Sequence, residues 1–309
     1  MHLILAPLHG FTEVTFREVY FRHFGGIDKV MAPFISLTHG DKITALKVKD
    51  VLPERNAQVP VIPQVLGNDS DDFILLCRFL SDELGYKEVN WNLGCPINGI
   101  VRKKRGSGIL PFPEMIDQLL EKIIPGISMD LSIKLRLGLK TTEEFTAVAE
   151  VLNNYPLKNI TIHPRIGIQQ YEGNVLLDDL ERMIPYVKHP IIYNGDIHSF
   201  DDYVSIRNRF SFGDFMLGRG VFYNPFLPEM IKAETQVLPA DAKARFINFY
   251  TELETATRHS RKFWMSKMKE YWKYYGTFMK LGDERQLQLF RVKSEDEWNS
   301  LVSEILASP

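Results

Sequence analysis

The segment NWNLGCP, residues 90–96, places one of only two cysteines of the chain in a turn that follows an apolar run. Gly94 and Pro96 flank Cys95, so a turn directs its side chain. At its usual pKa of ~8.5 a thiol keeps most of its proton at neutral pH, which suits a general acid better than a nucleophile. A Cys–His nucleophile with His163 is the alternative, but the sequence carries no signature of such a pair.

Other apolar runs carry polar residues that are costly to bury. Lys134 stands inside the run LSIKLRLG, where a lysine needs an anion or a polar opening. Gln64 and Asn92 also stand inside apolar runs, where burying a polar amide costs free energy, although less than burying a charge. A flavin would satisfy all three, because its ring edge offers donors and acceptors and a nearby cation stabilises the anionic reduced ring. Structural hydrogen bonds would explain either amide alone, but not Lys134 together with them.

Two late turns, NGDI (194–197) and LGRG (217–220), expose backbone. Gly195, Gly218 and Gly220 would let a phosphate approach the main chain, and Arg219 would add charged donors. Either turn alone is most simply a tight turn, whereas both together, after the last two strands of a barrel, favour a phosphate site.

Eight apolar runs alternate with helical spacing, and such alternation predicts βαβ units with a parallel sheet. Eight units within about 250 residues are typical of a (β/α)8 TIM barrel. A doubly wound sheet would need fewer strands and a glycine-rich first turn. The predicted strands lie in residues 2–7, 29–34, 60–67, 88–94, 131–138, 159–165, 190–196 and 214–220.

Composition limits the remaining possibilities. The chain has 309 residues, a formal net charge of −2 and 45% hydrophobic residues, as in ordinary globular proteins. Cys77, in the helical run FILLCRFL, is expected in the core, and two cysteines provide neither a disulfide framework nor a zinc motif. No run has the length of a signal peptide or a membrane span, so a cytoplasmic protein is expected.

The alternation stops near Pro239, which predicts a barrel domain at 1–238 and a small all-helical domain at 239–309. Residues 258–280 carry one acid and seven basic residues among seven Phe, Trp and Tyr side chains, a pattern that suits a phosphate backbone with unstacked bases or, equally, a solvated face over an aromatic core. The loop VRKKR (101–105), just past Cys95, is a second basic cluster and favours the RNA-binding interpretation. The seven basic residues are Arg258, Arg261, Lys262, Lys267, Lys269, Lys273 and Lys280.

Eight segments in register resemble the dihydrouridine synthases, flavin enzymes that reduce uridine in transfer RNA. Asn90 replaces the usual aspartate, Leu8 a commoner methionine and Pro164 a usual glycine, and none of these changes removes a group that the chemistry requires. The segments are LAPLHGFTEVTFR (5–17), PQVLGN (63–68), NWNLGCP (90–96) with VRKKRGSGIL (101–110), IKLRLG (133–138), IHPRIGIQQYEGN (162–174), YNGDI (193–197) and MLGRG (216–220).

The resemblance implies a barrel that holds FMN, reduced by NADPH, with Cys95 delivering a proton to C5 of uracil after hydride reaches C6. It implies FMN contacts at Ala6, Pro7, Leu8, Gln64, Asn92, Lys134, His163, Asn194, Gly195, Asp196, Gly218 and Arg219. Substrate or RNA contacts are expected at Asn92, Arg136, Lys103, Arg105, Arg165, Lys267, Lys269 and Lys273.

Two rival functions remain open from the sequence. One is an FMN barrel acting on a small substrate, as in dihydroorotate dehydrogenases or ene-reductases, although such enzymes have no need of a basic helical tail. The other is an RNA-binding relative that has lost catalysis. A monomer is expected for an enzyme that binds a large RNA, and the uridine that is reduced cannot be read from one chain.

Overall fold

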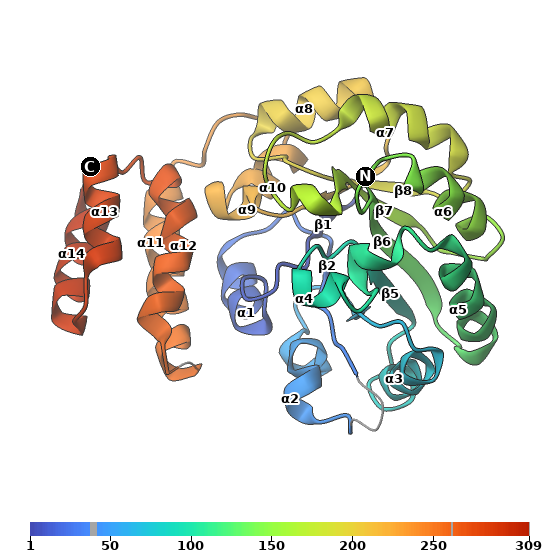
Figure 1. Ribbon diagram of the computed structural model, residues 1–309. Coiled ribbons are helices and arrows are strands. Elements are labelled where there is room, and N and C mark those ends of the chain that lie inside the picture. Colours follow the sequence, from blue (N-terminus) through green and yellow to red (C-terminus); the bar gives the residue numbers. More distant parts are fainter. Residues whose placement is uncertain (38–41, 261, 309) are drawn as a thin grey trace. The chain divides into compact units, whose positions relative to one another are not determined.

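The computed structural model describes residues 1–37, 42–260 and 262–308 of the chain (Figure 1). These residues form two compact units that are discontinuous in sequence. The first comprises Met1–Val14, Ile27–Asp196 and Arg207–Gly218, and the second comprises Thr15–Gly26, Ile197–Ile206 and Arg219–Pro309.

The first unit contains one sheet of nine strands in which every pairing is parallel. The first strand pairs with the last, since Ile4 lies opposite Met216. The strands are β1 (Leu3–Leu5), β2 (Lys29–Met31), β3 (Val61–Ile62), β4 (Gln64–Val65), β5 (Glu88–Leu93), β6 (Asp130–Gly138), β7 (Ile160–Ile166), β8 (Ile191–Asn194) and β9 (Asp214–Leu217).

The two ends of this sheet, β3 and β4, are halves of one strand interrupted at Pro63. Proline has no N–H for a sheet ladder, so the strand breaks there. Ile35 bridges the break on the β2 side: its N–H donates to Gln64 O at 2.8 Å, and its carbonyl accepts from Leu66 N at 2.9 Å. The sheet is therefore a barrel of eight strands, and the (β/α)8 prediction is confirmed.

Helices follow the strands as the apolar spacing predicts. In α3 (Ser70–Asp82), Asp69 caps the first turn by accepting from Asp71 N and Asp72 N, and the apolar side of the helix is buried. Pro113 opens α5 at a position where its missing N–H costs nothing. The remaining helices before β9 are α1 (Val14–His23), α2 (Ala45–Val48), α4 (Asn98–Val101), α5 (Pro113–Gly126), α6 (Glu144–Leu152), α7 (Leu177–Met183) and α8 (Phe200–Arg209), with short 3-10 turns at η1 (Lys49–Val51), η2 (Pro53–Arg55), η3 (Gly106–Ile109), η4 (Gly167–Gln169) and η5 (Ile184–Tyr186).

The barrel interior has an apolar side and a polar side. The apolar side is a buried cluster contributed by β1, β2, β8 and β9 and the residue that follows β1; its members are Ile4, Ala6, Met31, Ile192 and Met216. The polar side comes from the strands between them, where successive inward positions are amides, hydroxyls and cations. Its members are Gln64, Asn90, Asn92, Ser132, Lys134, Arg136, Thr161, His163 and Arg165.

The second unit is helical. Its helices after β9 are α9 (Gly220–Tyr223), α10 (Leu227–Lys232), α11 (Ala242–Ser260), α12 (Trp264–Phe278), α13 (Asp283–Arg291) and α14 (Glu295–Ala307). Residues 15–26 of α1 and the turn after it belong to this unit as well. The ring of Phe249 on α11 lies 4.9 Å from that of Phe24 and 6.1 Å from that of Phe16, measured between centroids.

The aromatic residues of α12 form the core of this helical unit. Trp272 is fully buried, and its indole N–H donates to Tyr250 Oη at 3.0 Å. Trp264, Tyr271 and Tyr275 are also buried. The expectation that these rings offer stacking surfaces to unpaired bases is therefore wrong for them, because side chains of the same unit already cover their faces.

Within the described part of the chain, no helix is both long enough and apolar enough to cross a bilayer.

Candidate active site at the carboxyl ends of the strands

The turn that carries Cys95 follows β5 directly and is held from both sides. The side-chain oxygen of Asn92 accepts from the backbone nitrogens of Gly94 at 3.0 Å and Cys95 at 2.9 Å. The carbonyl oxygen of Cys95 accepts from Ser107, and Gly106 adopts a left-handed φ of 58° next to it. The backbone that carries the thiol is thus fixed on both sides.

The environment of Cys95 keeps its thiol protonated. Burial raises the pKa of the thiol, while a backbone N–H from Ile97 and the charges of Arg136 and Lys134 lower it by less. A raised pKa keeps the proton on sulfur at neutral pH. The two cations would stabilise the thiolate that remains once the proton has been given away.

Lys134 projects from β6 on the face that also carries Arg136. The pKa of Lys134 is lowered to about 7, mainly by burial and also by the charge of Arg136, while Cys95 opposes the shift. Within the described residues its ammonium has no hydrogen-bond or ion-pair partner. A half-buried lysine without an anion is costly, so the site lacks a negative group that the chain itself does not supply.

Four buried side chains on β4, β5 and β6 form one chain of hydrogen bonds. Asn90 Nδ2 donates to Ser132 Oγ at 3.0 Å, and Asn90 Oδ1 accepts from Gln64 Nε2 at 2.8 Å. Gln64 Oε1 then accepts from Asn92 Nδ2 at 2.8 Å. Because each amide uses both its donor and its acceptor, the rotamers of Gln64 and Asn92 are fixed before any ligand arrives.

Arg136 is buried at the end of β6. Its Nη1 donates to the carbonyl oxygen of Ile166 at 2.9 Å, and its guanidinium lies 5.2 Å from the ring centroid of Tyr171. Burial lowers the pKa of Arg136, although the neighbouring Tyr171 raises it. Tyr171 was not among the predicted site residues, although it lies inside the quoted segment 162–174; it is 49% exposed and its ring is 6.3 Å from that of His163.

The ends of β7 and β8 are joined by an ion pair between the buried Arg165 and the half-buried Asp196. Arg165 Nη1 donates to Asp196 Oδ1 at 2.9 Å, and Arg165 Nη2 lies 2.5 Å from Asp196 Oδ2. The guanidinium is 1% exposed and also lies 3.1 Å from His163 Nε2. Arg165 was expected to contact substrate or RNA, whereas in the structure it is buried and its charge is paired with Asp196.

The first turn and the two glycine turns lie near the apolar side of the barrel. Thr12, another residue that sequence reasoning did not single out, holds the segment Ala6–Pro7–Leu8: its hydroxyl accepts from Leu8 N at 2.8 Å and donates to Ala6 O at 3.0 Å. Asn194 Nδ2 donates to Met216 O at 2.9 Å and ties β8 to β9.

The three glycines predicted to admit a phosphate differ in their surroundings. A Cβ atom on Gly220 would overlap the backbone oxygen of Ile197, so a glycine is required there by packing. A Cβ atom on Gly195 would lie only 3.0 Å from Val175 Cγ1, so neighbouring side chains would have to shift to admit a larger residue there. A Cβ atom on Gly218 would find its nearest neighbour, Ala6 Cβ, at 3.7 Å, which leaves the backbone approachable. Arg219 is the first residue of the last segment of the second unit.

The basic loop 101–105 is anchored by Asn68, which lies inside the quoted segment 63–68 but was not among the predicted site residues. Asn68 Oδ1 accepts from Arg105 Nε at 2.8 Å, and Asn68 Nδ2 donates to Lys103 O at 3.0 Å. Lys103 is exposed and Arg105 is half-buried. The loop therefore presents its charges from a fixed backbone.

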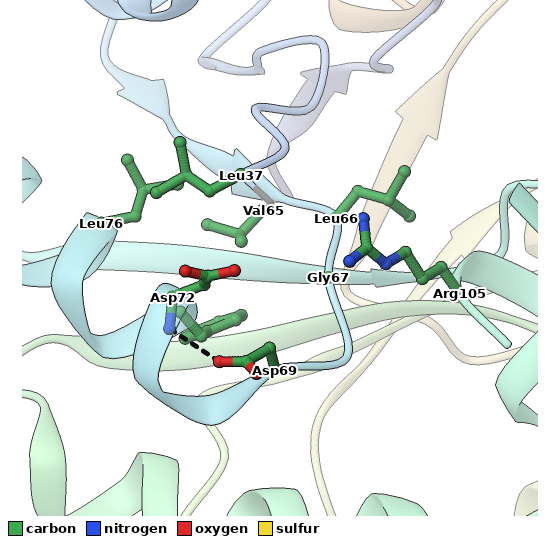
Figure 2. Close-up of a pocket in the computed structure, with 9 residues that line it drawn as sticks. Leu37, Val65, Leu66, Gly67, Asp69, Asp72, Leu76 and Arg105 are labelled. Carbon is green, nitrogen blue, oxygen red and sulfur yellow. Dashed lines mark hydrogen bonds between the residues drawn. The ribbon is translucent and has the colours of Figure 1, made fainter. Parts of the chain in front are cut away.

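Figure 2 shows a pocket lined in part by Arg105, whose side chain lies near Leu66, with Asp69 capping the first turn of α3. Its volume of about 10 Å³ holds a single water at most, so it is a packing gap and not a ligand site. In the part of the chain that is described, no three His, Cys, Asp or Glu side chains are grouped as metal ligands.

A family model described as dihydrouridine synthase matches residues 4–307, which is nearly the whole chain. The chain belongs to this family. It is an enzyme family of oxidoreductases, and several curated relatives are similar over most of their length.

Three such relatives illustrate the similarity. The tRNA-dihydrouridine(16) synthase of Neisseria meningitidis serogroup A is 25% identical over 304 residues, covering 94% of this chain and 90% of the relative. That of Pseudomonas putida is 28% identical, covering 75% and 74%. The tRNA-dihydrouridine synthase B of Pasteurella multocida is 26% identical, covering 73% and 67%.

Solved structures share the fold at low identity. A variant of NCR from Zymomonas mobilis has a TM-score of 0.52 at 12% identity, covering 79% of this chain and 90% of that one. A 2-naphthoyl-CoA reductase in complex with 2-naphthoyl-CoA has a TM-score of 0.59 at 10% identity, and this chain spans only 50% of its length. At such identities the likeness concerns the barrel fold alone.

Only some of the basic side chains in the helical unit are free to bind RNA. Lys267 is 6% exposed, and its ammonium lies 2.6 Å from Glu270 Oε2. Lys269 donates to the carbonyls of Phe290 and Val292 at the end of α13, whereas Lys273 is exposed. Of the other basic residues in this segment, Lys262 and Lys280 are exposed, and Arg261 lies outside the described residues.

Proposed function

We propose that this chain reduces uridine to 5,6-dihydrouridine in transfer RNA, with FMN as its cofactor and NADPH as the reductant. The observation that carries the proposal is the placement of a protonated thiol, Cys95, beside the cations Lys134 and Arg136 in a chain of the dihydrouridine synthase family. The small-substrate alternative is less favoured, because it leaves the exposed basic loop beside Cys95 without a use.

The residues at the barrel end fit an anionic, flat cofactor. Lys134 lacks a negative partner, and Gly218 leaves its backbone open to a phosphate. Gln64 and Asn92 are held in single rotamers on the polar side of the barrel, where they would orient the flavin ring. When bound and reduced, FMN supplies the hydride that C6 of the uracil accepts.

The chain's own groups would complete the reaction at C5. Cys95 gives its proton to C5, which turns the double bond into a single bond and leaves a thiolate. Lys134 and Arg136 stabilise that thiolate, and a proton from water restores the thiol. The raised pKa of Cys95 prevents early loss of the proton, so the acid is in its active form at neutral pH.

Transfer RNA would be held by exposed cations on both units. Lys103 lies on the basic loop next to the Cys95 turn, and Lys273 lies on α12. Phosphate contacts of this kind position an RNA without reading its sequence. The target base has to leave its stack to reach the barrel end, at a cost of a few kcal/mol that is smallest in an irregular loop.

The test is a spectrum of the purified protein followed by an anaerobic titration. A flavin absorbance that bleaches with NADPH and returns only when transfer RNA lacking dihydrouridine is added would support the proposal. Mass spectrometry of the recovered RNA would then locate the dihydrouridine. Position 16 is the first to examine, because the relatives from Neisseria and Pseudomonas are named for it.

Two outcomes would contradict the proposal. Bleaching that is unaffected by RNA would indicate a small-substrate oxidoreductase. Absence of flavin, even after incubation with FMN, together with retained RNA binding would indicate a relative that has lost catalysis. Faster bleaching with NADH than with NADPH would change only the identity of the reductant and would leave the rest of the proposal intact.

A further inference from the structure

We propose that Arg165 and Asp196 are positioning residues that hold His163 as the neutral tautomer with its proton on Nδ1. The proposal rests on the hydrogen-bond geometry at the ends of β7 and β8. It depends on the proposed function only for the identity of the group that the Nδ1–H would meet, which would be an acceptor on FMN.

The guanidinium of Arg165 has almost no donor left for a ligand. Nη1 donates one hydrogen to Asp196 Oδ1 at 2.9 Å and has its second for His163 Nε2 at 3.1 Å. Nη2 donates one to Asp196 Oδ2 at 2.5 Å and the other to Gly173 O at 2.6 Å. Only Nε lacks a partner, and it is buried.

This geometry decides the proton of His163. An arginine N–H can only donate, and the guanidinium stays protonated in proteins, so His163 Nε2 must accept. A neutral imidazole that accepts at Nε2 carries its proton on Nδ1. Protonation of both nitrogens would set an N–H against an N–H of Arg165, so the doubly protonated ring is disfavoured in this arrangement.

Asp196 fixes the direction of Arg165. A bidentate carboxylate–guanidinium pair is stronger and more directional than a single contact. Asp196 itself adopts a left-handed φ of 34°, which a non-glycine residue rarely does. The ion pair helps to hold the backbone of Asp196 there, and in return the carboxylate holds the guanidinium plane against His163.

The test is nitrogen-15 NMR of the eight histidines of the chain, with the His163 signals assigned by their loss in His163→Gln. Long-range nitrogen–proton correlations distinguish the two neutral tautomers directly. In the wild type we expect the Nδ1–H pattern for His163 at pH 7. In Arg165→Met and Asp196→Asn we expect a shift toward the Nε2–H pattern and protonation of the ring as the pH falls to 6.

The matched control is Arg209→Met, which removes another arginine paired with carboxylates, those of Asp178 and Glu181, on the surface of the same unit. It should leave the His163 signals unchanged. A wild-type Nε2–H pattern would overturn the proposal even if no variant folds. So would an unchanged Nδ1–H pattern in a folded Arg165→Met, which would mean that the pair merely fastens the loop at Gly173.

The NMR readout requires neither flavin nor RNA, so it stands or fails separately from the proposed function. A second readout applies to protein that binds FMN: Arg165→Met should weaken FMN binding roughly tenfold, the effect of losing one oriented hydrogen bond of ~1.4 kcal/mol. Arg209→Met should bind FMN as the wild type does.

Discussion

Both donors of Ser107 are directed at the carbonyl oxygen of Cys95: the backbone nitrogen and the side-chain oxygen each lie 3.0 Å from it. Ser107 lies in η3, which follows the basic loop 101–105. The backbone that presents the proposed acid and the backbone that presents the proposed phosphate contacts are thus fastened to each other. RNA bound to the loop would be held in register with the thiol.

Gly106→Ala should disturb this connection. The residue has a φ of 58°, and an added Cβ would lie 2.6 Å from Cys95 O. The left-handed conformation alone costs a non-glycine residue ~1–2 kcal/mol. We expect lower stability and at least a tenfold loss of RNA reduction, measured by denaturant unfolding and dihydrouridine formation. Gly99→Ala, where an added Cβ meets nothing within 4 Å, should behave as the wild type, and equal losses in both variants would refute this account.

Cys95→Ala should separate the two half-reactions. The variant keeps every group proposed to bind flavin, so it should retain FMN and be reduced by NADPH at the wild-type rate. Loss of a general acid lowers turnover by ~10²–10⁴-fold. Stopped-flow absorbance measures both steps, and oxidation by RNA at the wild-type rate would exclude the assignment.

The same assignment predicts a pH profile. Burial raises the pKa of Cys95, and the anionic reduced flavin would supply the negative group that keeps Lys134 charged. Oxidation of the reduced, flavin-loaded enzyme by RNA should therefore be insensitive to pH through neutrality. It should fall only above the ordinary thiol range, where the proton is lost. A decline that begins below pH 8 would indicate a different acid.

Lys134→Met should stabilise the flavin-free protein at neutral pH. The folded-state pKa is lowered to about 7, so between that value and 10.5 the unfolded chain binds a proton that the folded chain does not. Stability of the wild type therefore rises with pH across this window. The advantage of the variant should be on the order of 2–4 kcal/mol at pH 7 and should shrink by pH 9.5, as measured by denaturant unfolding. A constant difference would contradict the lowered pKa, and the variant should also retain less FMN.

The double variant Lys103→Ala with Lys104→Ala should weaken RNA binding through charge alone. Each lost phosphate contact reduces the magnitude of the slope of log K against log salt by ~0.7–0.9, so the loss of two should reduce it by ~1.4–1.8. Flavin reduction by NADPH should be unchanged. Lys122→Ala, an exposed lysine on α5, is the control, and an unchanged slope in the double variant would show that the loop does not contact phosphate.

The barrel could be predicted from the sequence because its signals are local. Each strand is an apolar run closed by a turn, and its inward polar residues follow from the alternation of side chains along a strand. Cys95 and Lys134 were found in this way, since a polar residue in an apolar run stands out without any knowledge of its neighbours.

The partners of these residues could not be predicted, because they are distant in sequence. Asp196 is 31 residues from Arg165, and Asn68 is 37 residues from Arg105. Nothing near Arg165 indicates that its charge is neutralised internally. In the same way, helical spacing groups the aromatic rings of α12 on one side but does not say whether that side faces solvent or a core, which is how Lys267 was misjudged as accessible.

The contribution of residues 15–26 to the helical unit bears on how the architecture can be recombined. Phe16, Tyr20 and Phe24 share one aromatic cluster with Phe249, although more than 200 positions of the chain separate them. A chimera that exchanges everything after Pro239 between two relatives would join rings that have not been selected together. A productive crossover has to carry the N-terminal helix along with the tail, so these two stretches should be inherited as a pair.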